Sequence, residues 1–248
     1  MLLDLLTRVS AGLPSSLKYK LNALRRPYTF VLRLGKPVVQ VPTMAGKVNW
    51  KIDELTTQRF LRGTYEQYMQ DAFAKFIRPG DCVYDIGAHA GYHSLLCGLL
   101  VGSTGRAFAF EPHPLNCRSI QRQLELNPTL NVTLVQHALS DVCSRVHLDS
   151  RPGRSKAHIS ERGEFEVEAE TIDHLVETGA LPPPSLIKID VEGHETQVLR
   201  GGLKTIQTHK PIVLVDHNDD RTFQIVNELM TPLGYGVSDA GLVISVPR

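Results

Sequence analysis

The sequence predicts an α/β fold in which helices cover both faces of a parallel sheet. From residue 65 onward, short apolar runs alternate with stretches of helical periodicity, which is typical of parallel strands joined by crossover helices. The predicted strands of this sheet are residues 82–86, 107–111, 132–136, 186–190 and 212–216. The chain has 248 residues, of which 42% are hydrophobic and 21% charged, so it is long enough to bury a complete core.

Shorter segments at the start of the chain predict an addition to this sheet. Leucines in the first 24 residues recur at roughly helical spacing. Three further runs predict short strands joined by glycine-containing turns, at residues 28–34, 37–42 and 47–53. We therefore expect an N-terminal helical and β extension over residues 1–60, followed by a main domain over residues 61–248.

Two more strand pairs are expected within the main domain. Residues 145–150 and 164–170 predict a hairpin inserted between the third and fourth strands of the sheet. Residues 234–248 predict two strands joined by a turn at residues 239–241. The second pair would add antiparallel strands to the edge of the sheet.

The charge balance points to a small molecule as the partner. The formal net charge is +1, and no basic stripe with interleaved aromatic residues is present, so we expect no nucleic-acid partner. No apolar run approaches the roughly 18 to 20 residues that span a bilayer, and the N-terminus lacks the basic region of a signal peptide. We expect a cytoplasmic protein that forms homo-oligomers, if at all, through the N-terminal helix. The four cysteines are irregularly spaced and are expected to be reduced core thiols.

A nucleotide-binding turn is predicted where the strand at residues 82–86 meets the next helix. The segment DIGAHAG, residues 85–91, contains glycines that let a ligand approach the backbone, and the following helix N-terminus favours an anionic group. Glu111 ends the next strand, where a carboxylate can accept hydrogen bonds from both hydroxyls of a ribose. The two features together predict an adenosine-containing cofactor.

NAD and S-adenosylmethionine both carry adenosine, and the turn favours S-adenosylmethionine. The glycine spacing is GxxxG, not the GxGxxG of dinucleotide sites, and the Asp85 carboxylate would repel a pyrophosphate. S-adenosylmethionine has an ammonium, a sulfonium and one carboxylate, which suit an acidic strand end beside helix N–H groups. An NAD-dependent oxidoreductase is the main alternative, and a non-catalytic module that binds S-adenosylmethionine is another.

These residues belong to a longer pattern that resembles the FkbM family of methyltransferases. The matching segments are GTYEQY (63–68), RPGDCVYDIGAHAGYHSL (78–95), FEPHPLN (110–116), ALSD (138–141), ETIDHL (170–175) and LIKIDVEGHETQVLRG (186–201). The resemblance implies a class I, Rossmann-like sheet of seven strands and S-adenosylmethionine as the methyl donor. It also implies methylation of a hydroxyl group on a sugar or polyketide-like metabolite.

Several residues around the turn are expected to contact the cofactor. Glu66 matches the segment of the family that precedes the turn and could reach the amino group of the cofactor. Pro112 and Asn116 would border the adenine and ribose, and Ala138 and Asp141 the adenine, although ordinary turn or capping roles fit Pro112, Asn116 and Asp141 equally well. The predicted cofactor-binding residues are Glu66, Asp85, Gly87, Ala88, His89, Gly91, Tyr92, Glu111, Pro112, Asn116, Ala138, Asp141 and Asp190.

The acceptor is expected at the end of the strand at residues 186–190. An SN2 transfer to an alcohol needs a positioned acceptor and a base, and the segment KIDVEGHE supplies ionisable side chains there. We expect Asp190 to orient the cofactor or acceptor, and Glu192 or His194 to take the proton. Asp190, Asp216 and Asn218 could instead hold Mg²⁺ through hard oxygen ligands, although the family resemblance does not imply a metal.

Overall fold

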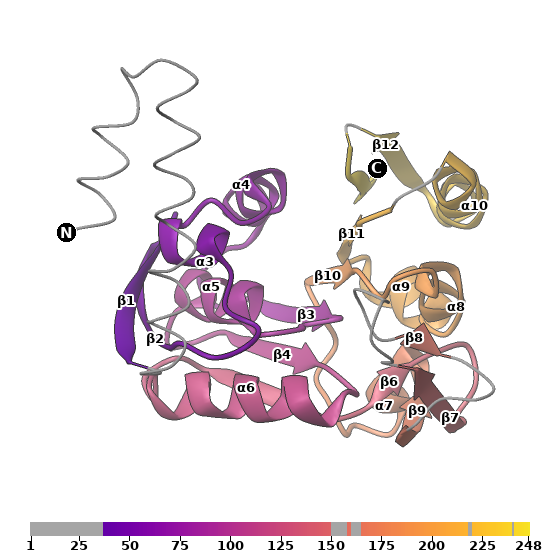
Figure 1. Cartoon of the computed structure of the whole chain (residues 1–248). Helices are drawn as coiled ribbons and strands as arrows, with labels where there is room; N and C mark the ends of the chain where they lie inside the picture. Colours follow the sequence, from indigo (N-terminus) through magenta and orange to yellow (C-terminus); the bar gives the residue numbers. More distant parts are fainter. Residues whose placement is uncertain (1–36, 150–157, 160–164, 218–219, 240) are drawn as a thin grey trace, which may run out of the picture.

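A seven-stranded sheet forms the centre of the computed structural model, which describes residues 37–149, 158–159, 165–217, 220–239 and 241–248 (Figure 1). The strand order is β12-β13-β11-β10-β3-β4-β5. Five strands are parallel, namely β3 (Cys82–Ile86), β4 (Arg106–Phe110), β5 (Val132–Val135), β10 (Leu186–Ile189) and β11 (Ile212–Val215). The five strands predicted for this sheet are confirmed to within one residue at each end.

An antiparallel pair completes one edge of the sheet. The strands β12 (Tyr235–Asp239) and β13 (Val243–Pro247) pair with each other, and β13 also pairs with β11. The edge pair predicted from the end of the sequence is therefore confirmed. The predicted α/β fold class is confirmed as well, because helices cover a sheet of seven strands.

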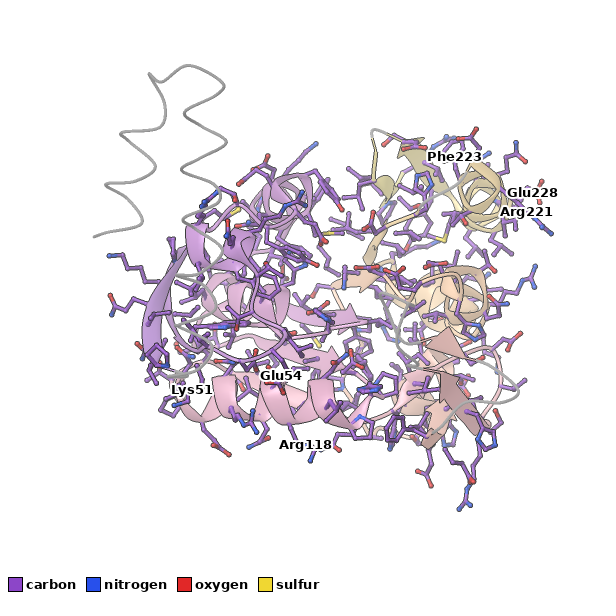
Figure 2. All side chains as sticks on the ribbon, in the orientation of Figure 1. Lys51, Glu54, Arg118, Arg221, Phe223 and Glu228 are labelled. Atoms are coloured by element: carbon purple, nitrogen blue, oxygen red, sulfur yellow. The ribbon has the colours of Figure 1, made fainter. Side chains whose placement is uncertain are left out.

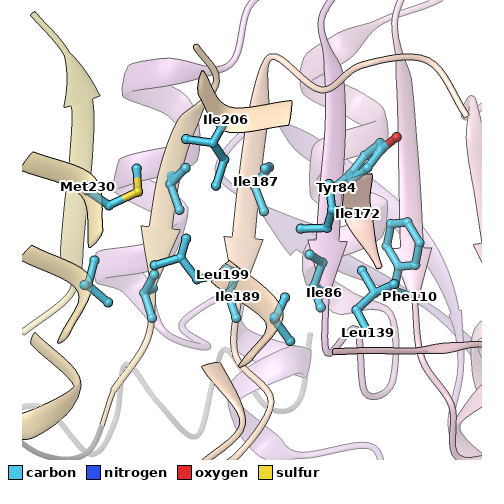
Figure 3. Close-up of a cluster of buried hydrophobic side chains, with 14 of the residues drawn as sticks. Tyr84, Ile86, Phe110, Leu139, Ile172, Ile187, Ile189, Leu199, Ile206 and Met230 are labelled. Atoms are coloured by element: carbon cyan, nitrogen blue, oxygen red, sulfur yellow. The ribbon is translucent and has the colours of Figure 1, made fainter. Parts of the chain in front are cut away.

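Alternate residues of each strand point to opposite faces of the sheet, and helices bury both faces. Leu186 packs with α4 (Gln67–Phe76) and α5 (Tyr92–Val101) on one face. Its neighbour Ile187 packs on the other face (Figure 3). The helices of that other face are α7 (Ile172–Glu177), α8 (Glu195–Arg200), α9 (Leu203–His209) and α10 (Asp220–Met230). A short 3-10 helix, η1 (Thr231–Leu233), follows α10.

The helix α6 (Pro114–Glu125) shows why these segments form surface helices. Cys117 and Ile120 are buried beneath it, whereas Arg118 points outward, as Arg221 and Glu228 do on α10 (Figure 2). One apolar stripe per helix is the pattern of a helix that covers a sheet. Pro114 stands in the first turn of α6, where its missing N–H leaves no internal hydrogen bond unmade.

A small hairpin, β1 (Val38–Thr43) and β2 (Gly46–Lys51), precedes the main sheet and is followed by α3 (Gln58–Arg62). The Asn127 side chain accepts a 2.9 Å bond from the Asn49 N–H and donates a 2.7 Å bond to the Asn49 carbonyl, so it satisfies the edge of β2. Trp50 and Phe60 share a core with Tyr92 of α5. The strands predicted at 37–42 and 47–53 are confirmed. The strand predicted at 28–34 and the N-terminal helix lie outside the described residues, and the boundary at residue 60 stays a prediction.

A second, four-stranded sheet lies beside the end of β5. Its order is β6-β9-β7-β8, with β6 (Ala138–Leu139), β7 (Ser144–Asp149), β8 (His158–Ile159) and β9 (Phe165–Glu170). The strands β7 and β9 are antiparallel, so the inserted hairpin is confirmed. The strands β6 and β8 were not predicted, because two residues are too few to show a periodicity.

Two other expectations concern membrane-spanning segments and the cysteines. No helix in the described part of the chain is long and apolar enough to cross a membrane. Cys97 and Cys117 are buried and unpaired, and Cys82 is half-buried. Cys143 is exposed, so the expectation of four core thiols is wrong for this residue.

Candidate functional site

The turn between β3 and α5 packs closely against the ends of two neighbouring strands. Gly87 and Gly91 have φ values of +81° and +85°, in the left-handed region that favours glycine. A Cβ atom on Gly87 would lie 1.8 Å from the carbonyl oxygen of Asp190, so the end of β10 approaches the turn more closely than a side chain permits. The N–H groups of Gly87 and Ala88 each donate a 3.0 Å bond to the carbonyl oxygen of Phe110. The turn is therefore fixed to the ends of both β4 and β10.

Replacement of Gly87 by alanine should weaken cofactor binding about tenfold or more, because the new Cβ must push the turn away from Asp190. The left-handed backbone alone should cost about 1–3 kcal/mol of unfolding free energy. Gly179→Ala is the matched control, since Gly179 has a φ of +72° with nothing within 4 Å of its added Cβ. Denaturation and calorimetric titration with S-adenosylmethionine measure both effects. Equal affinities in the two variants would show that the close approach does not matter.

Glu111 follows β4 and is oriented by the neighbouring backbone. Its side chain accepts 2.8 Å hydrogen bonds from the N–H of His89 on one oxygen and from the N–H of His113 on the other, and Asn116 adds a third. Burial raises the pKa of Glu111 to about 7, although these hydrogen bonds act in the opposite direction. A carboxylate has about four lone-pair sites, so one is open to a ribose hydroxyl, and the site now used by Asn116 could take the second.

Asp85 forms a buried ion pair with Lys188 instead of facing open space. The Lys188 ammonium lies 2.9 Å from Oδ1 of Asp85, directly across the β3–β10 register, and Ser94 donates a 2.5 Å bond to Oδ2. Lys188 lowers the pKa of Asp85 against the opposing effect of burial. Asp85 is 0% exposed and contacts Lys188 and Ser94, and its expected contact to the cofactor stays a prediction. Because Lys188 neutralises the Asp85 carboxylate, the argument that Asp85 repels a pyrophosphate loses its basis.

Three carboxylates meet at the edge of the sheet beside this pair. One oxygen each of Glu66, Asp190 and Asp216 lie within 4.8 Å of one another. Hydroxyl groups already bind two of them, because Tyr65 donates to Glu66 and Tyr68 donates a 3.0 Å bond to Oδ2 of Asp216. Burial raises the pKa of Glu66. The cluster therefore offers a negative, partly desolvated surface suited to a cation or to hydroxyl donors.

Several of the predicted cofactor-binding residues line a pocket between the turn and this cluster. Its lining residues are Phe60, Tyr65, Gly87, Ala88, His89, Ala90, Tyr92, His93, Lys188 and Asp190. His93, one of these lining residues, is 4% exposed, and burial together with Lys188 lowers its pKa to about 4, so its ring is neutral near pH 7. Aromatic rings form one side of the pocket. The rings of Phe60 and Tyr92 stack with their centroids 5.1 Å apart, and Tyr65 meets Phe60 edge-on with a centroid distance of 4.6 Å.

The loop after β10 lies over the neighbouring strand ends. Glu192 adopts a left-handed backbone with a φ of +57°, and His194 directly precedes α8 without a side-chain capping bond. Nε2 of His194 lies 2.9 Å from the hydroxyl of Ser140, which in turn donates a 3.1 Å bond to Oδ1 of Asp141. The structure therefore brings His194 and Asp141 together through a residue that was not predicted.

The remaining predicted residues are distributed around the same sheet edge. Pro112 follows Glu111 directly, and Ala138 is buried in β6. Asn218 lies outside the described residues. Sequence reasoning missed Phe60, Tyr68 and Ser140, of which the last two stand inside the segments GTYEQY and ALSD. A search of those segments for side chains with hydroxyl groups could have found them.

This mixed sheet, with a glycine turn and a buried carboxylate at the carboxyl ends of its parallel strands, has the architecture of a class I methyltransferase. The sequence model of the methyltransferase FkbM domain matches residues 85–237. The chain belongs to this family, and the assignment as a methyltransferase that uses S-adenosylmethionine is confirmed.

Individual relatives agree with this assignment. The chain is 27% identical over 168 residues to the hexuronic acid methyltransferase AglP of Haloferax volcanii, a match that covers 67% of each protein. It is similar to the crystal structure of a methyltransferase FkbM from Methylobacillus flagellatus, with 17% identity and a TM-score of 0.51, over 71% of this chain and 50% of that one. The chain thus spans about half the length of that protein. A precorrin-6y C5,15-methyltransferase from Geobacter metallireducens shares the fold, with 16% identity, a TM-score of 0.50, and coverage of 79% and 92%.

Proposed function

We propose that this protein transfers a methyl group from S-adenosylmethionine to a hydroxyl group of a sugar-type acceptor. The buried Glu111 carboxylate carries the proposal, because two backbone N–H groups orient it at the strand end where a ribose binds in this fold. The carboxylate cluster beside the turn adds acceptors for hydroxyl groups. The similarity to AglP, whose name gives a hexuronic acid as its substrate, supports a sugar acceptor.

The residues present fit the donor. Glu111 would accept hydrogen bonds from the ribose hydroxyls, and Glu66 would bind the ammonium group. The turn Gly87–Gly91, with Ala88, His89 and Tyr92, would enclose the methionine part, while Pro112, Asn116, Ala138 and Asp141 would border the ribose and adenine. When bound, the donor supplies a methyl group on a positively charged sulfur. Asp85 and Lys188 would hold the turn in place from beneath.

The acceptor would lie between the donor and the end of β10. Alignment of its oxygen with the methyl group supplies much of the acceleration, and removal of the hydroxyl proton adds roughly 10²- to 10⁴-fold. Asp190 would orient the acceptor, and Glu192 or His194 would take the proton. The expected cytoplasmic location and the oligomer through the N-terminal helix stay predictions.

Removal of divalent cations with EDTA is expected to leave the rate of methyl transfer unchanged. Glu66, Asp190 and Asp216 lie close enough to ligate Mg²⁺. However, the Lys188 ammonium already lies 3.8 Å from Oδ2 of Asp190 and would repel a divalent ion there. The rate of labelled methyl transfer with and without EDTA measures this. A loss that Mg²⁺ restores would instead place a cation in the cluster.

Labelled methyl transfer tests the proposed function. The protein is incubated with methyl-labelled S-adenosylmethionine and a set of simple glycosides and glycuronides. We expect label in an alkali-stable methyl ether, whereas methylation of a uronic acid carboxylate gives an alkali-labile ester. No label in any sugar would contradict the sugar acceptor, and label in the ester alone would contradict the hydroxyl.

A further inference from the structure

Three side chains of the loop after β10 are candidates to take the proton, and His194 has the most defined surroundings. Nε2 of His194 lies 2.9 Å from Oγ of Ser140, and the Ser140 hydroxyl donates to Oδ1 of Asp141 at 3.1 Å. No hydrogen bond joins Nδ1 of His194 to another described residue. One nitrogen of the ring is therefore held, and the other has no partner among the described residues.

The Ser140 hydroxyl links Asp141 and His194 and has a single proton to give. Its 3.1 Å contact with Asp141 can only be a donation, because a carboxylate only accepts, whereas the 2.9 Å bond to His194 can run in either direction. With the Ser140 proton on Asp141, the Ser140 oxygen accepts from His194 and Nε2 carries the ring proton. Nδ1 keeps its lone pair and is the basic atom of the ring.

Backbone contacts hold both Ser140 and His194 in place. The Ser140 N–H donates a 2.9 Å bond to the Glu170 carbonyl, and the Ser140 carbonyl packs where a Cβ on Gly201 would lie only 1.9 Å away. The His194 carbonyl accepts a 3.2 Å bond from the N–H of Val198 in the first turn of α8. Side chains held in this way lose little freedom when a substrate binds.

We propose that Ser140 and Asp141 are positioning residues that hold His194 with its proton on Nε2, and that Nδ1 of His194 takes the proton of the acceptor hydroxyl. In that step the oxygen–methyl bond forms, the methyl–sulfur bond breaks, and the hydroxyl proton moves to Nδ1 to give an imidazolium. S-adenosylhomocysteine leaves. The proposal rests on the proposed function, since only a hydroxyl acceptor has a proton to remove.

An imidazole also suits this role better than a carboxylate. A general base works best when its pKa lies near the working pH, and imidazole has an ordinary pKa near 6.5 whereas carboxylates have values near 4. Burial lowers the pKa of His194 from its ordinary value against the opposing charge of Asp141, so the ring is unprotonated at neutral pH. Asp190 already interacts with Lys188 and belongs to the carboxylate cluster.

The tautomer can be measured without any substrate, by NMR of ¹⁵N-histidine-labelled protein at pH 8. The His194 signals are assigned by their loss in His194→Gln. We expect the Nε2–H form in the wild type, and a shift toward the Nδ1–H form in Asp141→Ala, because Ser140 is then free to donate to Nε2. Asp141 is exposed, so this variant should keep the fold. Ser140→Ala should give a mixture of both forms.

Ser245→Ala is the matched control, because Ser245 is a buried serine of β13 whose hydroxyl has no partner among the described residues. Its His194 signals should equal those of the wild type. An Nδ1–H tautomer in the wild type, or unchanged His194 signals in both Asp141→Ala and Ser140→Ala, would overturn the positioning role.

Kinetics with methyl β-D-glucuronide as the probe test the base. His194→Gln should lower kcat for the alkali-stable ether about 100-fold and Ser140→Ala about tenfold, with affinity for S-adenosylmethionine changed less than about twofold. An unchanged kcat in His194→Gln would overturn the base while the proposed function stands. A wild-type protein that yields only the ester would instead contradict the hydroxyl acceptor, and the base with it.

Discussion

Glu111→Ala is expected to weaken the binding of S-adenosylmethionine roughly 100-fold or more. Hydrogen bonds to a charged group contribute about 1.5–3 kcal/mol each, and two ribose hydroxyls would lose theirs, while 1.4 kcal/mol corresponds to a factor of ten. The variant also leaves the N–H groups of His89 and His113 without their present acceptor. Isothermal titration calorimetry gives the dissociation constants.

Glu228→Gln serves as the control, because Glu228 points to solvent from α10 (Figure 2). Its affinity should equal that of the wild type. An affinity in Glu111→Ala within threefold of the wild type would show that the ribose does not bind at Glu111.

The Glu111 carboxyl should also make the affinity for S-adenosylmethionine depend on pH. Burial raises the pKa of Glu111 to about 7, so below this pH the carboxyl is protonated and accepts hydrogen bonds less strongly. Wild-type affinity should therefore rise between pH 6 and pH 8, and by more than the affinity of Glu111→Gln, which has no proton to lose. The amino group of the cofactor titrates equally with both proteins, so the difference isolates Glu111. Parallel pH profiles would contradict this assignment.

Lys188→Met is expected to lower the free energy of unfolding by about 3–5 kcal/mol, the usual effect of removing one partner of a buried ion pair. Asp85 would then keep a buried charge without its cationic partner, although the Ser94 hydroxyl still donates to it. The carbonyl of Gly87 would also lose the 2.9 Å bond that Lys188 donates. Chemical denaturation followed by circular dichroism measures the change.

The double variant Asp85→Asn/Lys188→Met should recover much of this loss, because it removes both charges. Lys204→Met is the surface control, since Lys204 pairs with Glu177 at 3.0 Å in an exposed position and should show no measurable change. A double variant no more stable than Lys188→Met would indicate that packing of the lysine, and not its charge, stabilises the site.

The sheet could be predicted because its strands are buried on both faces. Apolar runs such as 186–190 and 212–216 have no polar face, and turns with glycine separate them from helices. The edge pair was recognised from its turn. By contrast, β6 forms only through pairing with β9, about 30 residues along the chain, and β8 is a two-residue strand too short to show a local pattern.

The site was predictable where a residue type follows a strand end, as Glu111 and Asp190 do. It was not predictable where contacts depend on register or on long loops. Lys188 meets Asp85 because the two face each other across β10 and β3, which are about 100 residues apart. Ser140 meets His194 across 54 residues of sequence, through loops whose paths the sequence does not determine.

Calorimetric titration of the whole chain with S-adenosylmethionine and, separately, with NAD tests the central claim most directly. The structure and the family predict saturable binding of one S-adenosylmethionine per chain and no binding of NAD. Binding of NAD without binding of S-adenosylmethionine would contradict the assignment of the turn at residues 85–91 and Glu111 as a methyl-donor site.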